Sequence, residues 1–292
     1  MSALRLGLLG FPLGHSLSPR LHTAALSAMG LEGEYRLYPV PPLPEGETAW
    51  RALFERLRAG DLHGLNVTIP HKQAVMNELD FCEDEARIIG AVNTLGVDDS
   101  GRVWGANTDA PGFLRDLYAQ LGNILPLQGG RALVLGAGGA ARAVVYALIR
   151  AEWEVWVCAR RGEQAQTLVE SLRAFLPYAA LTVLEGVPPR EALPPRLNLL
   201  VNATPLGMVP RPETLPWDEA LPIPEGAAVY DLVYNPRETR LLAFARACGA
   251  PAAGGLGMLV EQAALALERW SGQAVPRSAM WQAVAEDSSP QT

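Results

Sequence analysis

Short apolar runs alternate with amphipathic segments along the first third of the chain. The runs 4–10, 35–40 and 65–69 have the length and composition of strands in a covered sheet. Between them, apolar residues recur at helical spacing after Ser18, a good N-cap residue, and again over 47–59. This alternation predicts a mostly parallel sheet with helices on both faces.

The pattern changes after residue 90. A turn signal at 98–101 lies between two short β-prone segments and predicts a hairpin, and a helix over 111–122 leads into a second domain. There, residues 131–150 have the pattern of a strand, a glycine-rich turn and a helix, followed by a strand at 154–160. A βαβ unit of about 30 residues suits half of a dinucleotide-binding domain.

The remaining segments complete a two-domain α/β plan. The expected elements are strands at 197–203 and 227–234, an irregular proline-broken segment at 205–226, helices at 238–249 and 258–272, and a disordered tail at 286–292. The expected domains are an α/β substrate domain (1–106), a Rossmann-type doubly wound nucleotide domain (107–254) and a C-terminal part (255–292). The C-terminal helix is expected to return to the first domain.

Composition excludes several classes of partner. The 292 residues carry a net charge of −7, which argues against nucleic acid or an anionic membrane surface. Cys82, Cys158 and Cys248 lack metal-ligand spacing and are expected to be buried thiols. The N-terminus has no signal-peptide pattern, and no apolar run reaches the roughly 18 residues that span a bilayer. A cytoplasmic protein, monomeric or homodimeric, is the natural expectation.

The glycine-rich turn indicates a dinucleotide cofactor. The string GAGGAA fits GxGxxA between a strand and a helix, so backbone N–H groups at a helix N-terminus would meet a pyrophosphate. The next strand ends in Arg160 and Arg161, where NAD-binding units place a carboxylate on the ribose, and no carboxylate follows until Glu163. Two guanidinium groups favour a 2′-phosphate and therefore NADP, although solvated arginines at a strand end are the alternative.

The stretch NVTIPHK supplies a candidate acid. Lys72 stands just past the strand at 65–69, and carbonyl reduction needs a proton donor at the oxygen that becomes a hydroxyl group. Asp109 is a plausible partner for Lys72, and it could also cap the helix that follows it. For an arbitrary lysine, a solvated turn is the ordinary interpretation.

Eight segments, in order, resemble one enzyme family. They are GHSLSPRLH (14–22), NVTIPHK (66–72), GAVNT (90–94), GANTDAPG (105–112), LGAGGAARA (135–143), NATPLGM (202–208), YDLVYNP (230–236) and GLGMLVEQAA (255–264). Together they resemble shikimate dehydrogenase over about residues 5 to 272. The resemblance implies NADPH-dependent reduction of 3-dehydroshikimate to shikimate, in the pathway to chorismate and the aromatic amino acids.

The resemblance also implies roles for individual residues. Lys72 and Asp109 would be the acid–base pair, and Ser16 and Ser18 would hold the substrate carboxylate. Further substrate contacts fall on Thr68, Asn93, Tyr234 and Gln262. The cofactor contacts are implied at Gly136, Ala137, Gly138, Gly139, Ala140, Arg160, Arg161, Leu232 and Gly255. This chain departs from the family at Thr23, where asparagine is frequent, and at Ala159-Arg160-Arg161, where Asn-Arg-Thr is usual.

Other functions fit the sequence less well. Its four histidines show no HExxH spacing, so no metal site is expected, and GHSLS lacks the last glycine of a nucleophile elbow. A methylene-tetrahydrofolate dehydrogenase fits the serine and GLGML segments poorly. A non-catalytic sensor would lose the Lys/Asp pair, which this chain keeps. A quinate/shikimate dehydrogenase that also uses NAD stays open.

Overall fold

The protein, described by a computed structural model, divides into two compact units. Unit 1 comprises Met1–Thr108 and Val260–Thr292, and unit 2 comprises Asp109–Leu259. The described residues are 3–186, 193–194 and 196–285, so the tail expected to be disordered lies outside them. The division from the sequence was placed a few residues earlier, after residues 106 and 254.

Unit 1 holds a six-stranded sheet in the order β2-β1-β3-β5-β6-β4. Its elements, in chain order, are β1 (Leu4–Gly10), α1 (Ser18–Ala28), β2 (Gly33–Pro39), α2 (Glu47–Arg58), β3 (Gly64–Val67), the 3-10 helix η1 (Ala74–Glu78), β4 (Phe81–Cys82), α3 (Asp84–Ile89), β5 (Thr94–Val97) and β6 (Val103–Ala106). Helix α8 (Leu256–Ser271) begins at the end of unit 2 and continues into unit 1, and α9 (Arg277–Ala285) follows it in unit 1. Strands β2, β1 and β3 run parallel, whereas β5 is antiparallel to β3 and β6, which confirms the predicted hairpin.

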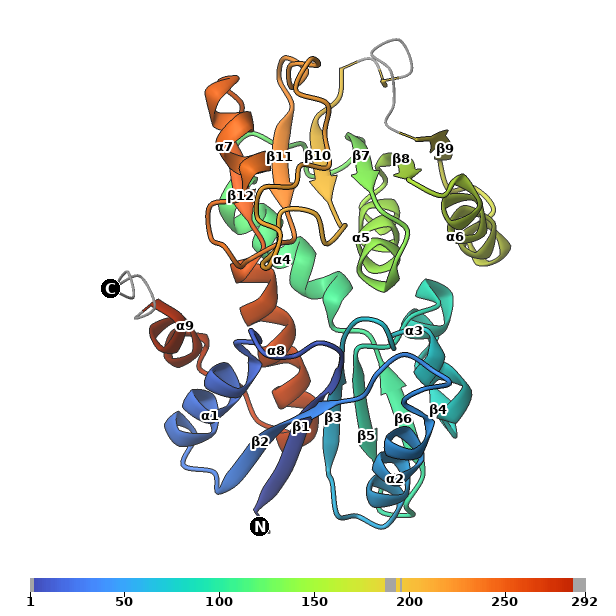
Figure 1. The fold of residues 1–292 in the computed structure, drawn as a ribbon, viewed down its shortest axis with the longest axis vertical. Helices are drawn as coiled ribbons and strands as arrows, with labels where there is room; N and C mark the ends of the chain where they lie inside the picture. Colours follow the sequence, from blue (N-terminus) through green and yellow to red (C-terminus); the bar gives the residue numbers. More distant parts are fainter. Residues whose placement is uncertain (1–2, 187–192, 195, 286–292) are drawn as a thin grey trace. The chain divides into compact units, whose positions relative to one another are not determined.

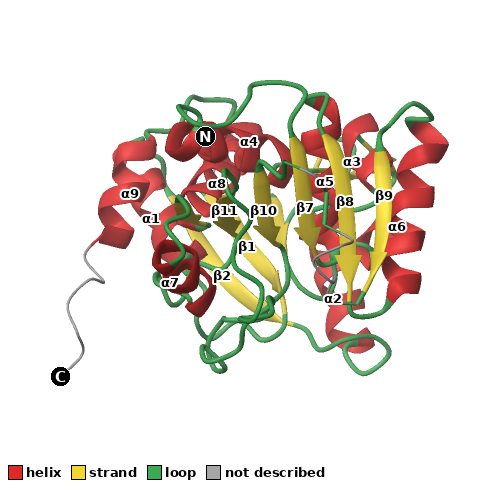
Figure 2. Cartoon of the chain, turned by 90° about the horizontal axis from the view of Figure 1, so that it is seen from above, coloured by secondary structure: helices red, strands yellow, loops and turns green. Residues whose placement is uncertain are grey.

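Unit 2 holds a fully parallel sheet in the order β12-β11-β10-β7-β8-β9. Its elements are α4 (Asp109–Leu121), β7 (Arg131–Leu135), α5 (Gly139–Arg150), β8 (Glu154–Ala159), α6 (Gly162–Phe175), β9 (Leu181–Glu185), β10 (Leu199–Asn202), β11 (Ala228–Asp231), α7 (Arg240–Ala247) and β12 (Ala252–Gly254). Figure 2 shows strands β11, β10, β7, β8 and β9 side by side. The chain order reverses direction at β7, as in a doubly wound Rossmann sheet, so the expected fold class is confirmed.

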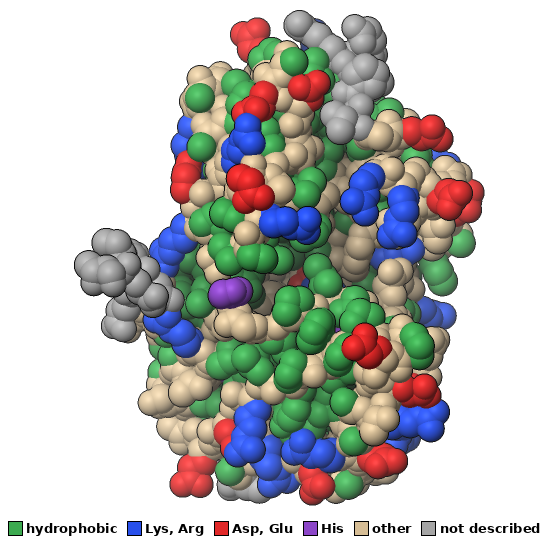
Figure 3. All heavy atoms as spheres, in the orientation of Figure 1, with side chains coloured by type: hydrophobic (Ala, Val, Ile, Leu, Met, Phe, Trp, Pro, Cys, Tyr) green, Lys and Arg blue, Asp and Glu red, His purple; other side chains and the backbone are tan. Residues whose placement is uncertain are grey.

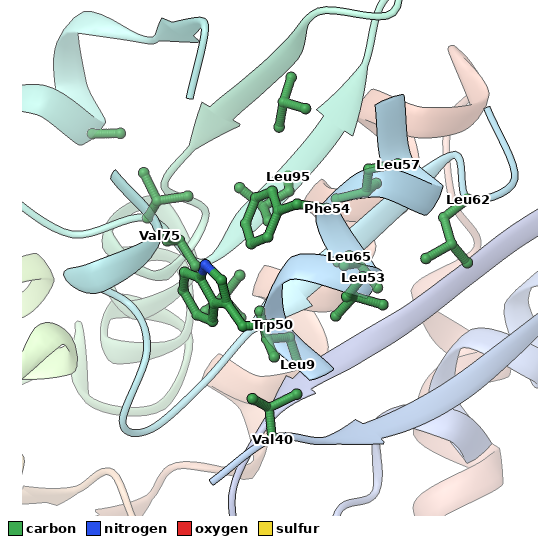
Figure 4. Packing of buried hydrophobic residues seen from close by; sticks show 14 residues of the cluster. Leu9, Val40, Trp50, Leu53, Phe54, Leu57, Leu62, Leu65, Val75 and Leu95 are labelled. Atoms are coloured by element: carbon green, nitrogen blue, oxygen red, sulfur yellow. The ribbon is translucent and has the colours of Figure 1, made fainter. Parts of the chain in front are cut away.

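The core of unit 1 fixes the loops that follow its parallel strands. Figure 4 shows Trp50 and Phe54 of α2 packed against apolar side chains of the sheet, among them Leu65 and Leu95. Phe54 is 1% exposed, and burial of such a side chain stabilises the fold by about 1.5–3 kcal/mol. The Trp50 indole also lies 5.1 Å from the ring of His71, so this core reaches the residue before Lys72.

Helix α8 joins the two units along the chain, and its later part belongs to unit 1. Figure 1 shows α8 as one continuous helix. In unit 1, the Trp270 indole Nε1 donates to the Leu95 carbonyl at 2.8 Å. The same ring covers Gly64, where a Cβ would lie 2.2 Å from Nε1. A side chain at position 64 would therefore push α8 off the sheet, and the expected return of this helix to the first domain is confirmed.

Several boundaries differ from those predicted. Residues 162–185 carry no element in the sequence prediction, yet they form α6 and β9. Strand β3 ends at Val67, before the cis peptide that joins Ile69 and Pro70, and not at residue 69. The segment 205–226 contains no helix or strand, as predicted. Trp217, which is 4% exposed, packs this segment against the hydrophobic core of unit 2.

Candidate functional site

Ser16 and Ser18 stand at the start of α1 in a different arrangement from the one predicted. Ser18 is the first helical residue and does not cap the helix with its side chain, because Leu17 occupies the N-cap position. Instead the Ser16 hydroxyl accepts a hydrogen bond from the Ser18 backbone N–H at 3.3 Å. The prediction that Ser18 is the N-cap is therefore wrong by one residue. Both serines remain at a helix N-terminus, where the helix dipole favours an anion.

Asn93 and Gln262 meet in unit 1 although 169 residues separate them in the chain. The Asn93 Nδ2 donates to Gln262 Oε1 at 3.4 Å and to Thr108 Oγ1 at 2.9 Å. Its Oδ1 accepts from the Thr108 backbone N–H at 2.7 Å and from the Thr94 hydroxyl at 3.0 Å. Because both ends of the Asn93 carboxamide are engaged, its orientation is fixed. The structure thus brings two predicted hydroxyl contacts together and adds Thr108, which the sequence reasoning missed.

Further buried side chains are hydrogen-bonded to the backbone of Asn93 and to one another. The Asn66 Nδ2 donates to the Asn93 carbonyl at 3.3 Å, and the Tyr35 hydroxyl donates to Asn66 Oδ1 at 2.8 Å. The imidazole of His22 stacks on Tyr35, with ring centroids 4.1 Å apart. Burial lowers the pKa of His22 to about 3, so this ring is neutral and adds no charge beneath the network.

Lys72 is the only lysine in the sequence. The loop that carries it is held on both sides: the Val92 N–H donates to the Lys72 carbonyl at 2.7 Å, and His71 Nε2 donates to the Val40 carbonyl at 2.7 Å. Thr68, earlier in the same loop, donates its N–H to the Leu9 carbonyl at 2.9 Å. The backbone at Lys72 is therefore positioned by β1, by the end of β2 and by the segment before β5.

Asp109 is the first residue of α4 and only 4% exposed. It directly follows Thr108, the hydrogen-bond partner of Asn93, so the fold of unit 1 fixes where the chain enters α4. Tyr234 follows β11 in unit 2, and burial raises the pKa of its phenol. The sequence correctly placed Asp109 at a helix start, but the residue lies inside the first turn and not before it.

The glycine-rich turn after β7 has the shape that a pyrophosphate needs. Gly136 has φ +114°, and a Cβ there would lie 2.9 Å from the Ala203 carbonyl oxygen. Gly138 occupies the N-cap position of α5, and a Cβ there would meet nothing within 4 Å. The backbone therefore faces open space at the N-terminus of a 12-residue helix. Ala137, Gly139 and Ala140 complete the turn, and these residues fit a dinucleotide phosphate.

The end of β8 presents two arginines. Arg160 and Arg161 are exposed, and Arg161 is the N-cap residue of α6 without a side-chain cap. Figure 3 shows arginine side chains gathered over this part of unit 2, in the region of α5, β8 and α6. The structure also brings Glu185, at the end of β9, beside this strand end through the pairing of β8 with β9. Sequence reasoning missed Glu185, because the β9 element itself was not predicted.

The loops after β10 and β11 are tied together by a buried carboxylate. Asp231 accepts hydrogen bonds from Asn202 Nδ2 at 2.8 Å, from the Val233 N–H at 3.0 Å and from the Thr239 hydroxyl at 2.6 Å. Burial raises the pKa of Asp231 to about 6. Leu232 follows this residue directly, and Gly255 lies so close that a Cβ there would be 2.3 Å from the Leu232 carbonyl oxygen. Two predicted nicotinamide contacts are thus neighbours.

The described part of the chain holds neither a metal-binding cluster nor a membrane-spanning helix. Within it, no group of three or more His, Cys, Asp or Glu residues could hold a metal ion. None of the helices described there is long and apolar enough to cross a membrane.

Comparison with known proteins relates this chain to named enzymes. Residues 8–95 match the family model of the shikimate dehydrogenase substrate binding domain, and residues 255–285 match that of the shikimate 5′-dehydrogenase C-terminal domain. The NADP(+) shikimate dehydrogenase of Salinibacter ruber is 46% identical over 285 residues, which cover 96% of this chain and 96% of that protein.

Solved structures agree with this relationship. The shikimate 5-dehydrogenase of Thermus thermophilus in complex with NADP(H) and shikimate has a TM-score of 0.81 and 42% identity, with 97% of this chain and 99% of that chain covered. The quinate dehydrogenase of Corynebacterium glutamicum in complex with NAD has a TM-score of 0.85 and 31% identity, with 97% and 99% covered. This chain belongs to the shikimate dehydrogenase family.

Proposed function

We propose that this protein catalyses the reversible NADPH-dependent reduction of 3-dehydroshikimate to shikimate, in the pathway to chorismate and the aromatic amino acids. The observation that carries the proposal is the Asn93–Gln262 hydrogen bond, which brings two of the proposed substrate contacts together on the unit that bears Lys72. The glycine turn of unit 2, open at Gly138, supports the cofactor assignment.

Lys72 is the proposed proton donor. When bound, NADPH supplies hydride to the substrate carbonyl carbon, and the ammonium group of Lys72 gives a proton to the oxygen as it becomes a hydroxyl group. In the reverse direction the neutral amine takes that proton back. Arginine serves every other basic position of the chain, but a guanidinium cannot exchange a proton near neutral pH, which accounts for the one lysine here. Asp109 is the proposed partner that orients Lys72 and accepts from a substrate hydroxyl.

The remaining roles concern binding. Ser16 and Ser18 would hold the substrate carboxylate at the start of α1, while Thr68, Asn93, Gln262 and Tyr234 would contact its other polar groups. Gly136 to Ala140 would take the pyrophosphate, with Arg160 and Arg161 at the 2′-phosphate and Leu232 and Gly255 at the nicotinamide. The expectation that all three cysteines are buried is wrong for Cys248, which is exposed, and holds fully only for Cys158, since Cys82 is half-buried. We propose a cytoplasmic monomer or homodimer without a nucleic-acid or membrane partner.

Two substitutions distinguish the proton-donor role of Lys72 from the effect of its positive charge. Lys72→Met removes the exchangeable proton and the charge, whereas Lys72→Arg keeps the charge but cannot exchange a proton near neutral pH. We expect each variant to lower kcat by roughly 10²-fold or more, with shikimate binding weakened less in the arginine variant. Stopped-flow hydride transfer and equilibrium binding of shikimate would measure the two effects. An arginine variant with near-normal kcat would remove Lys72 from its role as acid.

The single lysine permits a chemical test of the same role. An amine-directed acylating reagent has only Lys72 and the N-terminal amine as targets in this chain. Modification of Lys72, located by peptide mass mapping, should abolish turnover, and saturating shikimate should protect it. Full activity after complete modification of Lys72 contradicts the proposal.

A second candidate is a dehydrogenase that accepts quinate as well as shikimate and NAD as well as NADP. The fold match to a quinate dehydrogenase that binds NAD favours it. Steady-state kinetics with both substrates and both cofactors would decide, because a kcat/KM for quinate within about 10-fold of that for shikimate would support the broader enzyme.

A further inference from the structure

A carboxylate stands beside the arginines at the end of β8. Strands β8 and β9 run parallel, and Ala159 pairs with Glu185 at the carboxyl ends of both. Within β9, Glu185 is thus the residue that pairs with Ala159, which directly precedes Arg160. In dinucleotide-binding sheets, the residue at this level of the second strand reads the ribose 2′ position.

The backbone on either side of Glu185 is fixed. The strand itself ends at Glu185, and the Sγ of Cys158, in β8, donates to the carbonyl of the next residue, Gly186. Burial raises the pKa of the Cys158 thiol to about 11, so this sulfur stays protonated and keeps donating. These contacts hold β9 against β8 at the point where Glu185 leaves the sheet.

The side chain of Glu185 lies over the first turn of α6. A Cβ at Gly162, the first residue of that helix, would be 3.3 Å from Glu185 Cγ and 3.6 Å from its Oε1. The N-cap residue Arg161 supplies no side-chain acceptor to this turn. A carboxylate is favourable there because the N-terminal end of a 14-residue helix carries partial positive charge.

We propose that Glu185 is a specificity-determining residue that weakens the preference of this enzyme for NADP over NAD. Its negative charge opposes a 2′-phosphate held by Arg160 and Arg161, and its side chain lies beside the N-terminus of α6, whose partial positive charge would otherwise favour that phosphate. A ribose 2′-hydroxyl group is neutral and can donate to a carboxylate, so NAD suffers no such repulsion. This proposal rests on the assignment of Arg160 and Arg161 to the 2′ position in the proposed function.

The test is equilibrium binding, without turnover. Calorimetric titration of the full-length protein with NADP+ and NAD+ should show that Glu185→Gln binds NADP+ roughly 3- to 10-fold more tightly at low salt, the scale expected for one charge near a phosphate. Binding of NAD+ should stay within about twofold or weaken. The gain for NADP+ should shrink as ionic strength rises, because salt screens exposed charges.

Glu170→Gln is the matched control. Glu170 is exposed on α6, and its replacement by glutamine makes the same change in net charge as Glu185→Gln. It lies eight residues beyond Gly162, about 12 Å along the helix, where screening should leave little effect on the cofactor. Its binding of NADP+ should stay within about twofold of wild type.

Each outcome decides the proposal. A selective gain for NADP+ in the Glu185 variant alone supports it. Equal changes in the two variants, or equal changes for NADP+ and NAD+, overturn it while leaving the proposed function intact. A wild-type protein that binds neither dinucleotide overturns the proposed function and this proposal together.

Discussion

The pKa of the buried Asp231 carboxyl group depends on two opposing effects, hydrogen bonding and burial, and their balance can be measured. Three hydrogen-bond donors stabilise its ionised form, whereas complete burial stabilises the protonated form. Burial wins, and the pKa rises from 3.8 to about 6. The folded protein therefore binds more protons than the unfolded chain between those values, and its free energy of unfolding falls as pH rises through this window.

The size of this effect follows from the shift. A displacement from 3.8 to about 6 corresponds to about 3 kcal/mol lost between pH 3.5 and pH 7. Asp231→Asn removes the titration. The Oδ1 of the new asparagine can still accept from Asn202 and Val233, while its Nδ2 amide group faces the Thr239 hydroxyl. The substitution should therefore lower the free energy of unfolding by about one hydrogen bond, roughly 1 kcal/mol, at every pH.

The assay is urea unfolding followed by circular dichroism at several pH values. The difference in unfolding free energy between wild type and Asp231→Asn should move by about 2 kcal/mol in favour of the variant from pH 4 to pH 7, because part of the change already lies below pH 4. Asp218→Asn, an exposed carboxylate in the same unit, is the control and should give a small, flat difference. A flat difference for Asp231→Asn as well would refute the reasoning, since it would mean that the hydrogen bonds fully offset burial and leave the pKa unshifted.

Three further substitutions test binding and packing. Arg160→Ala should raise KM for NADP by roughly 10- to 100-fold and leave KM for NAD little changed, because one charge-assisted contact is lost; equal kcat/KM losses for both cofactors would count against a 2′-phosphate contact. Ser16→Ala should mainly raise KM for shikimate, since a carboxylate anchor acts in ground and transition states alike, and an unchanged KM with a large fall in kcat would contradict this role. Phe54→Ala should lower the free energy of unfolding by about 3–5 kcal/mol in urea titrations, whereas a cost under about 1 kcal/mol would show that the cluster collapses around the lost ring.

The sequence by itself determined the main elements and the candidate chemistry of this protein. Strand, glycine turn and helix at residues 131–150 follow from local spacing, and so does the position of Lys72 just past a strand. The sequence also shows that Lys72 is its only lysine, whereas every other Lys or Arg position is an arginine. Because arginine cannot serve as an acid near neutral pH, this choice of residue points to an acid–base role for Lys72. Such features are local, so nearest-neighbour preferences are enough to reveal them.

Only the tertiary structure decided which distant residues meet. Gln262 reaches Asn93 because the Trp270 ring fits over Gly64, a pairing that depends on the absence of one side chain far away in the chain. Glu185 lies beside Ala159 because β8 and β9 pair in register. The residue pattern within β9 does not indicate which strand it pairs with. Strand register and helix packing depend on the shapes of surfaces that exist only once both partners have folded, so this part of the site could not be derived from spacing along the chain.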